Sequence, residues 1–202
     1  MDMQVVGLLG GVASGKSTVA RLLVEAGAGL LDADRVGHQA LLLPEVEEAA
    51  RSRWGNKVFD AEGRLDRGRL AEIVFAPPPH GPEERRFLES LTHPKIAKII
   101  QRQADALARQ ACPVAVLDAP LLLEAGWDRL CNTLVFVQVP REIRLARATE
   151  RGWTPAEFAA REQAQISVEE KRSLAGHIVD NADGMEKTCR QVSRLWHSLT
   201  GE

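Results

Sequence analysis

The most constraining feature of this sequence is a glycine-rich segment close to its start. Residues 10–17 read GGVASGKS and match the pattern GxxxxGK[ST] in full. An apolar run at residues 4–9 precedes the pattern, and a segment with helical periodicity, residues 17–26, follows it. In this context glycines let backbone N–H groups turn inward around phosphate oxygens, and the helix N-terminus adds positive potential. The segment therefore predicts a phosphate-binding loop rather than an ordinary glycine turn.

Four more short apolar runs predict the other strands of a sheet. They lie at residues 30–31, 114–117, 133–139 and 177–179, and helical stretches separate most of them. This alternation predicts an α/β fold with an open parallel sheet flanked by helices, whose ligands bind beyond the carboxyl ends of the strands. The residues at those ends are Gly10, Asp32, Asp118 and Pro140.

Two intervals stand apart from this alternation. Residues 36–110 read as helical, with a proline-rich break at 76–82, and predict a helical substrate domain. Residues 154–157 carry a capping-box pattern, which residues 167–170 repeat, and two short capped helices are typical of a lid. We expect a nucleotide-binding core at 1–35, 111–145 and 176–202, a helical domain at 36–110 and a lid at 146–175.

Composition excludes several classes of protein. The 26 basic and 28 acidic residues leave a formal charge of -2, which argues against a strongly basic nucleic-acid-binding protein. The run at 4–9 is too short for a membrane span or a secretion signal. The three cysteines are too far apart in sequence for a typical zinc or redox site. We expect a cytoplasmic protein with reduced thiols, no nucleic-acid partner and no membrane association, monomeric by default.

Cationic side chains predict how the phosphates would be held. Lys16 is placed to reach the β and γ oxygens of a nucleoside triphosphate, and Ser17 is placed to ligate Mg²⁺. Three arginines, Arg144, Arg147 and Arg151, follow the fourth strand at spacings of three and four, so they can share one helical face. They could neutralise charge during phosphoryl transfer, or form a solvated face paired with Glu142 and Glu150.

Three aspartates end strands near the predicted loop. Asp32 and Asp34 follow the second strand, where a carboxylate could orient an acceptor hydroxyl and take its proton, or cap the next helix. Asp118 could hold magnesium through water, or simply support a turn beside Pro120. The residues alone leave these alternatives open.

The chain as a whole resembles the dephospho-coenzyme A kinase family. GLLGGVASGKSTVA at residues 7–20 resembles the opening of the family, and residues 32–34 its DAD segment. Residues 65–75 and 88–96 are similar to the patterns LxRxxLxxxVF and LExxxHPxI of the coenzyme A domain. The remaining matches are the PLLxE segment at 120–124, the RxxxR pair at 147–151, the lid residues Arg161, Gln165, Lys171 and Arg172, and the IxDN ending at 178–181.

The resemblance implies transfer of the γ-phosphoryl group of ATP to the 3′-hydroxyl of the ribose of dephospho-CoA, with Mg²⁺. It implies Asp34 as base, with Lys16, Arg147 and Arg151 stabilising the transferring group. The implied ATP-binding residues are Gly10, Gly11, Val12, Ala13, Ser14, Gly15, Lys16, Ser17, Thr18, Arg147 and Asn181. The implied acceptor-binding residues are Asp34, His93, Pro120, Leu121, Glu124 and Arg161.

Two positions leave room for other interpretations. His93 precedes a proline, and a histidine there is often a structural turn residue. Ala13 stands where the family commonly has glycine; we expect alanine to adopt the helical dihedrals used by much of such a loop, so that binding survives. The competing functions are a kinase of another small hydroxylated acceptor, such as a nucleoside monophosphate, and a catalytically silent nucleotide-binding module.

Overall fold

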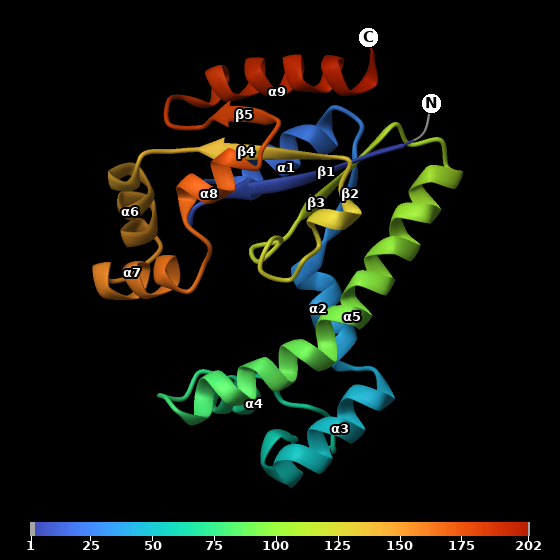
Figure 1. Ribbon diagram of the computed structural model, residues 1–202, viewed down its shortest axis with the longest axis vertical. Helices are drawn as coiled ribbons and strands as arrows, with labels where there is room; N and C mark the ends of the chain where they lie inside the picture. Colours follow the sequence, from blue (N-terminus) through green and yellow to red (C-terminus); the bar gives the residue numbers. More distant parts are fainter. Residues whose placement is uncertain (1–2, 202) are drawn as a thin grey trace. The chain divides into compact units, whose positions relative to one another are not determined.

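The computed structural model describes residues 3–201 and contains a five-stranded parallel sheet (Figure 1). The strands are β1 (Gln4–Gly10), β2 (Gly29–Asp32), β3 (Val114–Asp118), β4 (Thr133–Gln138) and β5 (His177–Asp180). Their order across the sheet is β2-β3-β1-β4-β5, and every neighbouring pair is parallel. All five strands predicted from the apolar runs are confirmed, as is the α/β class.

Helices α1 (Lys16–Glu25) and α9 (Met185–Thr200) pack on one face of this sheet. Alternate residues of β1, Val6 and Leu8, are fully buried there with Val19 and Leu23 of α1. Only 4% of the residues are aromatic, so aliphatic side chains fill most of this core. This core holds the carboxyl end of β1 and the start of α1 in fixed positions.

The rest of the chain supplies short helices beyond the strand ends. After β3 come a loop and the 3-10 helix η2 (Asp128–Leu130); after β4 come α6 (Arg141–Glu150), α7 (Pro155–Gln163) and α8 (Val168–Ser173). The capping box at Thr154 and Glu157 is confirmed, with the backbone N–H of each residue donating to the side chain of the other. Ser167 likewise accepts from the Glu170 N–H and starts α8.

The chain divides into two compact units, one of residues 1–32 and 101–202 and one of residues 33–100. The second unit contains α2 (Ala33–Leu41), α3 (Pro44–Trp54), η1 (Gly55–Val58), α4 (Arg67–Val74) and the first part of α5 (His80–Arg109). The boundaries of this unit, 33 and 100, differ from those of the predicted helical domain, 36 and 110. The last turns of α5 join the sheet unit because Leu107 fills the space over Gly29 of β2.

The unit of residues 33–100 has its own core. Ala50, Trp54 and Val58 are buried with Phe59 and Leu70. The Trp54 indole N–H donates to the Glu84 carboxylate at 2.7 Å, which satisfies its polar group. Such a core supports an independently packed helical unit.

Helix α5 settles the local structure around His93. His93 and Pro94 both lie inside α5, so the interpretation of His93 as a turn residue is wrong. Burial lowers the pKa of the His93 imidazole, whereas Glu89 acts to raise it. The proline-rich break is shorter than residues 76–82, because Pro82 already belongs to the first turn of α5, where a missing N–H costs no hydrogen bond.

Between residues 3 and 201, no helix combines the length and apolar character needed to cross a lipid bilayer. The three cysteines, Cys112, Cys131 and Cys189, form no disulfide. Burial raises the pKa of the Cys131 thiol to about 12, so this cysteine is thiol rather than thiolate at neutral pH.

Gly7 in the middle of β1 gives a test of the packing under the sheet. A Cβ there would lie 2.7 Å from Cys131 Sγ and 2.8 Å from Leu134 Cδ2. We expect Gly7→Ala to lower the free energy of unfolding by ~1–3 kcal/mol, measured by urea denaturation, because the core is overpacked. Gly176→Ala is the control, since its Cβ would meet Thr133 Oγ1 at an ordinary 3.5 Å. Equal midpoints for both variants would contradict the packing described.

Candidate functional site

The predicted phosphate-binding loop joins β1 to α1 at the carboxyl edge of the sheet. β1 is the central strand, and Gly10 at its end pairs with Val137 of β4. Lys16 is the first residue of α1, and Gly15 before it has a left-handed conformation with φ of 84°. The first N–H groups of an α-helix have no partner within the helix, so the start of α1 offers donors to an anion.

The Lys16 ammonium folds back over the loop. Its Nζ donates to the carbonyl oxygens of Gly10 at 3.2 Å and Gly11 at 3.4 Å. The pKa of Lys16 is lowered to about 8, first by burial and then by the nearby ammonium of Lys171, whereas the carboxylates of Asp118 and Glu124 act to raise it. A polyanion bound beside Lys16 would therefore relieve an electrostatic cost already present in the fold.

Two side chains from distant parts of the chain hold the carbonyl of Ser14. Asn181 Nδ2 donates to Ser14 O at 2.9 Å, and Arg147 Nη1 donates to the same oxygen at 3.4 Å. Arg147 Nη2 also donates to the carbonyl of Asn181 at 2.8 Å, and Thr188 donates to Asn181 Oδ1 at 3.0 Å. Asn181, Arg147 and the loop therefore form one hydrogen-bonded group. The predicted pairing of the arginines with Glu142 and Glu150 is not what organises this face.

The backbone of the loop differs from the expectation at one position. Ala13 has φ of 60°, in the left-handed region, rather than right-handed helical dihedrals. An alanine there costs ~1–2 kcal/mol relative to a right-handed conformation, because its Cβ approaches the following carbonyl. Residue 15 has no space for a side chain, because a Cβ added to Gly15 would clash with Asn181 Nδ2. The loop thus tolerates a side chain at residue 13 and excludes one at residue 15.

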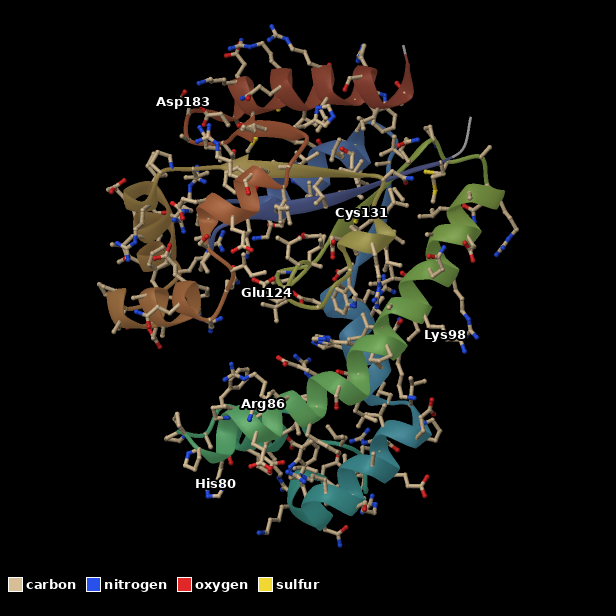
Figure 2. The ribbon with its side chains drawn as sticks, in the orientation of Figure 1. His80, Arg86, Lys98, Glu124, Cys131 and Asp183 are labelled. Atoms are coloured by element: carbon tan, nitrogen blue, oxygen red, sulfur yellow. The ribbon has the colours of Figure 1, made fainter. Side chains whose placement is uncertain are left out.

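Glu124 lies in the loop that follows β3, and Figure 2 labels it. Its Oε1 accepts from the Lys171 ammonium at 3.1 Å and from the Ile166 N–H at 2.9 Å, so it connects this loop to the start of α8. Lys171 is 2% exposed and also donates to Gln165 at 2.9 Å. Glu124 Oε2 is buried and has no hydrogen-bond partner within residues 3–201.

A small cavity lies between this pair and the loop. Its lining includes Gly10, Lys16, Pro120, Glu124 and Lys171. Two ammonium groups and one carboxylate thus meet beside the phosphate loop. The sequence identified Lys16 and Glu124, but it gave Lys171 no role beyond its place in the lid.

The aspartates occupy the ends of two neighbouring strands. Asp32 ends β2 in register with Asp118, which ends β3. Asp34 lies in the first turn of α2, two residues further on, and its side chain is exposed. Position 34 is therefore inside the helix rather than before it, so Asp34 does not occupy the N-cap position of α2.

Two of the four arginines predicted for the site, Arg151 and Arg161, lie at the surface. Arg151 follows α6 directly and is exposed, whereas Arg144 and Arg147 are within α6 and turn toward the loop. Arg161 of α7 stacks on the ring of Trp153, 4.2 Å from its centroid. The three arginines after β4 therefore do not act as a single solvated face.

The most informative contacts that sequence reasoning missed belong to Arg144. This residue is buried and bonded to Glu162, 18 positions away. No motif links the two residues, and the only signal in the sequence was the position of Arg144 one turn before Arg147.

Comparison with known proteins defines the family. The family model described as dephospho-CoA kinase matches residues 4–187. The chain belongs to the dephospho-CoA kinase family. A dephospho-CoA kinase from Symbiobacterium thermophilum is 41% identical, over 98% of this chain and 82% of its own length. Membership of this family makes the chain an ATP-dependent kinase.

Solved structures share the fold of this chain. A crystal structure of a Thermus thermophilus protein has a TM-score of 0.82 and 32% identity, covering 98% of both chains. A dephospho-CoA kinase from Campylobacter jejuni has a TM-score of 0.67 over 99% of both chains at 23% identity, and this likeness supports the fold. The sheet and loop are thus those of a P-loop kinase.

The two small residues of the loop give a paired test. We expect Gly15→Ala to raise the Kd for Mg·ATP by about tenfold or more, because the methyl group displaces Asn181 and strains the backbone. Ala13→Gly should leave the Kd within about twofold, since glycine adopts φ of 60° without strain. Isothermal titration with Mg·ATP measures both. Similar losses for the two variants would contradict the geometry of the loop.

The buried pair gives a test of stability. We expect Glu124→Gln to lower the free energy of unfolding by ~2–3 kcal/mol, because Lys171 would remain buried without a carboxylate. The double variant Glu124→Gln/Lys171→Met should recover part of that loss. Urea denaturation measures both.

The exposed pair Arg190–Glu186 is the control, and we expect Glu186→Gln to leave the urea midpoint unchanged. If Glu124→Gln had the same urea midpoint as Glu186→Gln, the Glu124–Lys171 pair would not contribute to the stability of the fold.

Proposed function

We propose that this protein transfers the γ-phosphoryl group of ATP to the 3′-hydroxyl of the ribose of dephospho-CoA, giving CoA and ADP. The observation that carries the proposal is the phosphate loop, whose carbonyls accept hydrogen bonds from Lys16, Arg147 and Asn181, in a chain of the dephospho-CoA kinase family. Its relatives are named for this acceptor. No observation favours a nucleoside monophosphate in its place.

In the proposed reaction Asp34 takes the proton of the acceptor hydroxyl. The hydroxyl oxygen then forms a bond to the γ-phosphorus, and the bond from that phosphorus to the bridging oxygen of ADP breaks. Asp34 is exposed and lies in the first turn of α2. Lys16 and the arginines Arg147 and Arg151 neutralise charge on the transferring group.

The donor set near the loop fits a magnesium ion carried by a nucleotide. No group of three or more His, Cys, Asp or Glu side chains able to hold a metal occurs within residues 3–201. Mg²⁺ typically takes few protein ligands and keeps water and phosphate oxygens as the others, so Ser17 and Asp118 suffice as its protein contacts. When bound, the ion would neutralise charge on the β and γ oxygens.

Six residues are proposed to bind dephospho-CoA. In the unit of residues 33–100, Asp34 and His93 are proposed to bind dephospho-CoA. In the sheet unit, the proposed contacts are Pro120, Leu121, Glu124 and Arg161. Glu124 Oε1 is occupied by Lys171, so Oε2, buried and without a hydrogen-bond partner within residues 3–201, is the oxygen proposed to meet the acceptor.

We also propose that residues 146–175 act as a lid and residues 36–110 as the coenzyme A domain. The lid proposal is supported by the two capped helices α7 and α8, which Gly152, with φ of 84°, separates from α6. A monomeric state and a cytoplasmic location remain predictions from the sequence. Size-exclusion chromatography with light scattering tests the first.

The decisive experiment is an acceptor assay. Purified protein is incubated with Mg·ATP and dephospho-CoA, and product mass and ADP are followed with AMP, CMP and UMP as competing acceptors. Coupled formation of ADP and 3′-phosphorylated CoA supports the proposal. Transfer only to a nucleoside monophosphate would show that the acceptor is that nucleotide and not dephospho-CoA. ATP binding without any transfer would indicate a catalytically silent nucleotide-binding module.

Substitution of Asp34 tests the proposed base. We expect Asp34→Asn to lower kcat by about 10²–10⁴-fold, because the amide cannot accept the proton, while the Kd for Mg·ATP stays within about twofold. Asp32→Asn is the matched control and should retain most activity. The reverse pattern would make Asp32 the base. Arg147 is a less informative target, because its guanidinium also holds the loop carbonyl of Ser14.

A further inference from the structure

Arg144 makes contacts behind the phosphate loop that no motif of the sequence explains. It is 4% exposed. Its Nη1 donates to the Val12 carbonyl at 3.2 Å and to Glu162 Oε1 at 2.6 Å, and its Nε donates to the Val139 carbonyl at 3.2 Å. The acceptors lie in the loop, in helix α7 and just after β4. One planar guanidinium therefore fixes three elements relative to one another.

The loop packs directly against this guanidinium. A Cβ on Gly11 would lie 2.6 Å from Arg144 Nη1 and 2.8 Å from its Cζ. Both distances are shorter than van der Waals contact, so any side chain at residue 11 would displace Arg144. Glycine at position 11 thus lets the Arg144 guanidinium approach the outer side of the loop. It equally leaves room for phosphate on the inner side.

Glu162 extends the contact to α7. Its Oε1 binds Arg144, and its Oε2 accepts from Arg141 at 2.9 Å. On the same helix, Phe158 is fully buried and packs in a cluster with Val12 of the loop. Helix α7 is therefore linked to the loop by the partly buried Arg144–Glu162 pair, through Arg144, and by one apolar contact.

We infer that Arg144 is a positioning residue for the donor nucleotide. It holds the Val12 carbonyl away from the phosphate side, which leaves the N–H groups of the loop facing the phosphates. Through Glu162 it also joins α7 to the loop, so that this helix of the proposed lid moves with the loop. Nε and Nη1 of Arg144 both donate to protein acceptors. The inference rests on the proposed function in that the loop binds ATP.

The test compares the two arginines that share Glu162. Arg144→Lys keeps the positive charge but loses the planar set of donors, whereas Arg141→Ala removes an arginine whose side chain is 55% exposed and donates to the other oxygen of Glu162. We expect Arg144→Lys to raise the Kd and KM for Mg·ATP by about tenfold or more, the loss typical of one charge-assisted hydrogen bond. The KM for dephospho-CoA should stay within about twofold. Arg141→Ala should leave all three constants within about twofold.

The outcomes separate positioning from simple structural support. If Arg144→Lys lowers the Tm but leaves the Kd for Mg·ATP unchanged, or if Arg141→Ala weakens ATP binding equally, the inference is wrong. Should Arg144→Lys fail to fold, Glu162→Gln leaves Arg144 in place with a weaker acceptor, and a selective rise in the Kd for Mg·ATP remains the expected result. An unchanged Kd in that variant would overturn the link to α7.

The titration with Mg·ATP contains no acceptor. Its result therefore remains valid even if the wild-type protein does not phosphorylate dephospho-CoA. A failure of the proposed function can thus be told apart from a failure of the inference about Arg144.

Discussion

The outward carbonyl groups of the phosphate loop are the constraint on which the site depends. A loop that turns its N–H groups toward an anion turns its carbonyls toward protein, and each carbonyl then needs a donor. Lys16 supplies it for Gly10 and Gly11, Arg144 for Val12, and Arg147 with Asn181 for Ser14. The loop is therefore not self-supporting, because two of these three groups of donors come from beyond β4.

The same donors concentrate positive charge beside the loop. Burial has already lowered the pKa of Lys16 to about 8, and Lys171 lies near it. Two carboxylates compensate part of this positive charge, because Glu162 pairs with Arg144 and Glu124 pairs with Lys171. Both pairs also fix a helix, α7 in the first case and α8 in the second. Electrostatic compensation and the placement of helices α7 and α8 thus depend on the same contacts.

The fold and the centre of the site could be predicted because their signals are local. Each strand is a short apolar run, and the capping box at residues 154–157 places the start of α7. The loop motif lies in one continuous stretch between β1 and α1. Two expectations drawn from neighbouring residues were wrong: Ala13 has φ of 60° instead of right-handed helical dihedrals, and His93 lies in a helix that continues through Pro94.

The sequence by itself determined the parallel α/β architecture, the phosphate loop with Lys16 and Ser17, and the resemblance to one kinase family, since each is encoded by neighbouring residues. Only the tertiary structure decided which arginine does what. Arg144, Arg147 and Arg151 look equivalent along the chain, yet one is bonded to Glu162 and Val12, one to Ser14 and Asn181, and one is exposed. The physical reason is that hydrogen-bond partners and burial depend on elements brought together by the sheet, which spacing along a single helix does not encode.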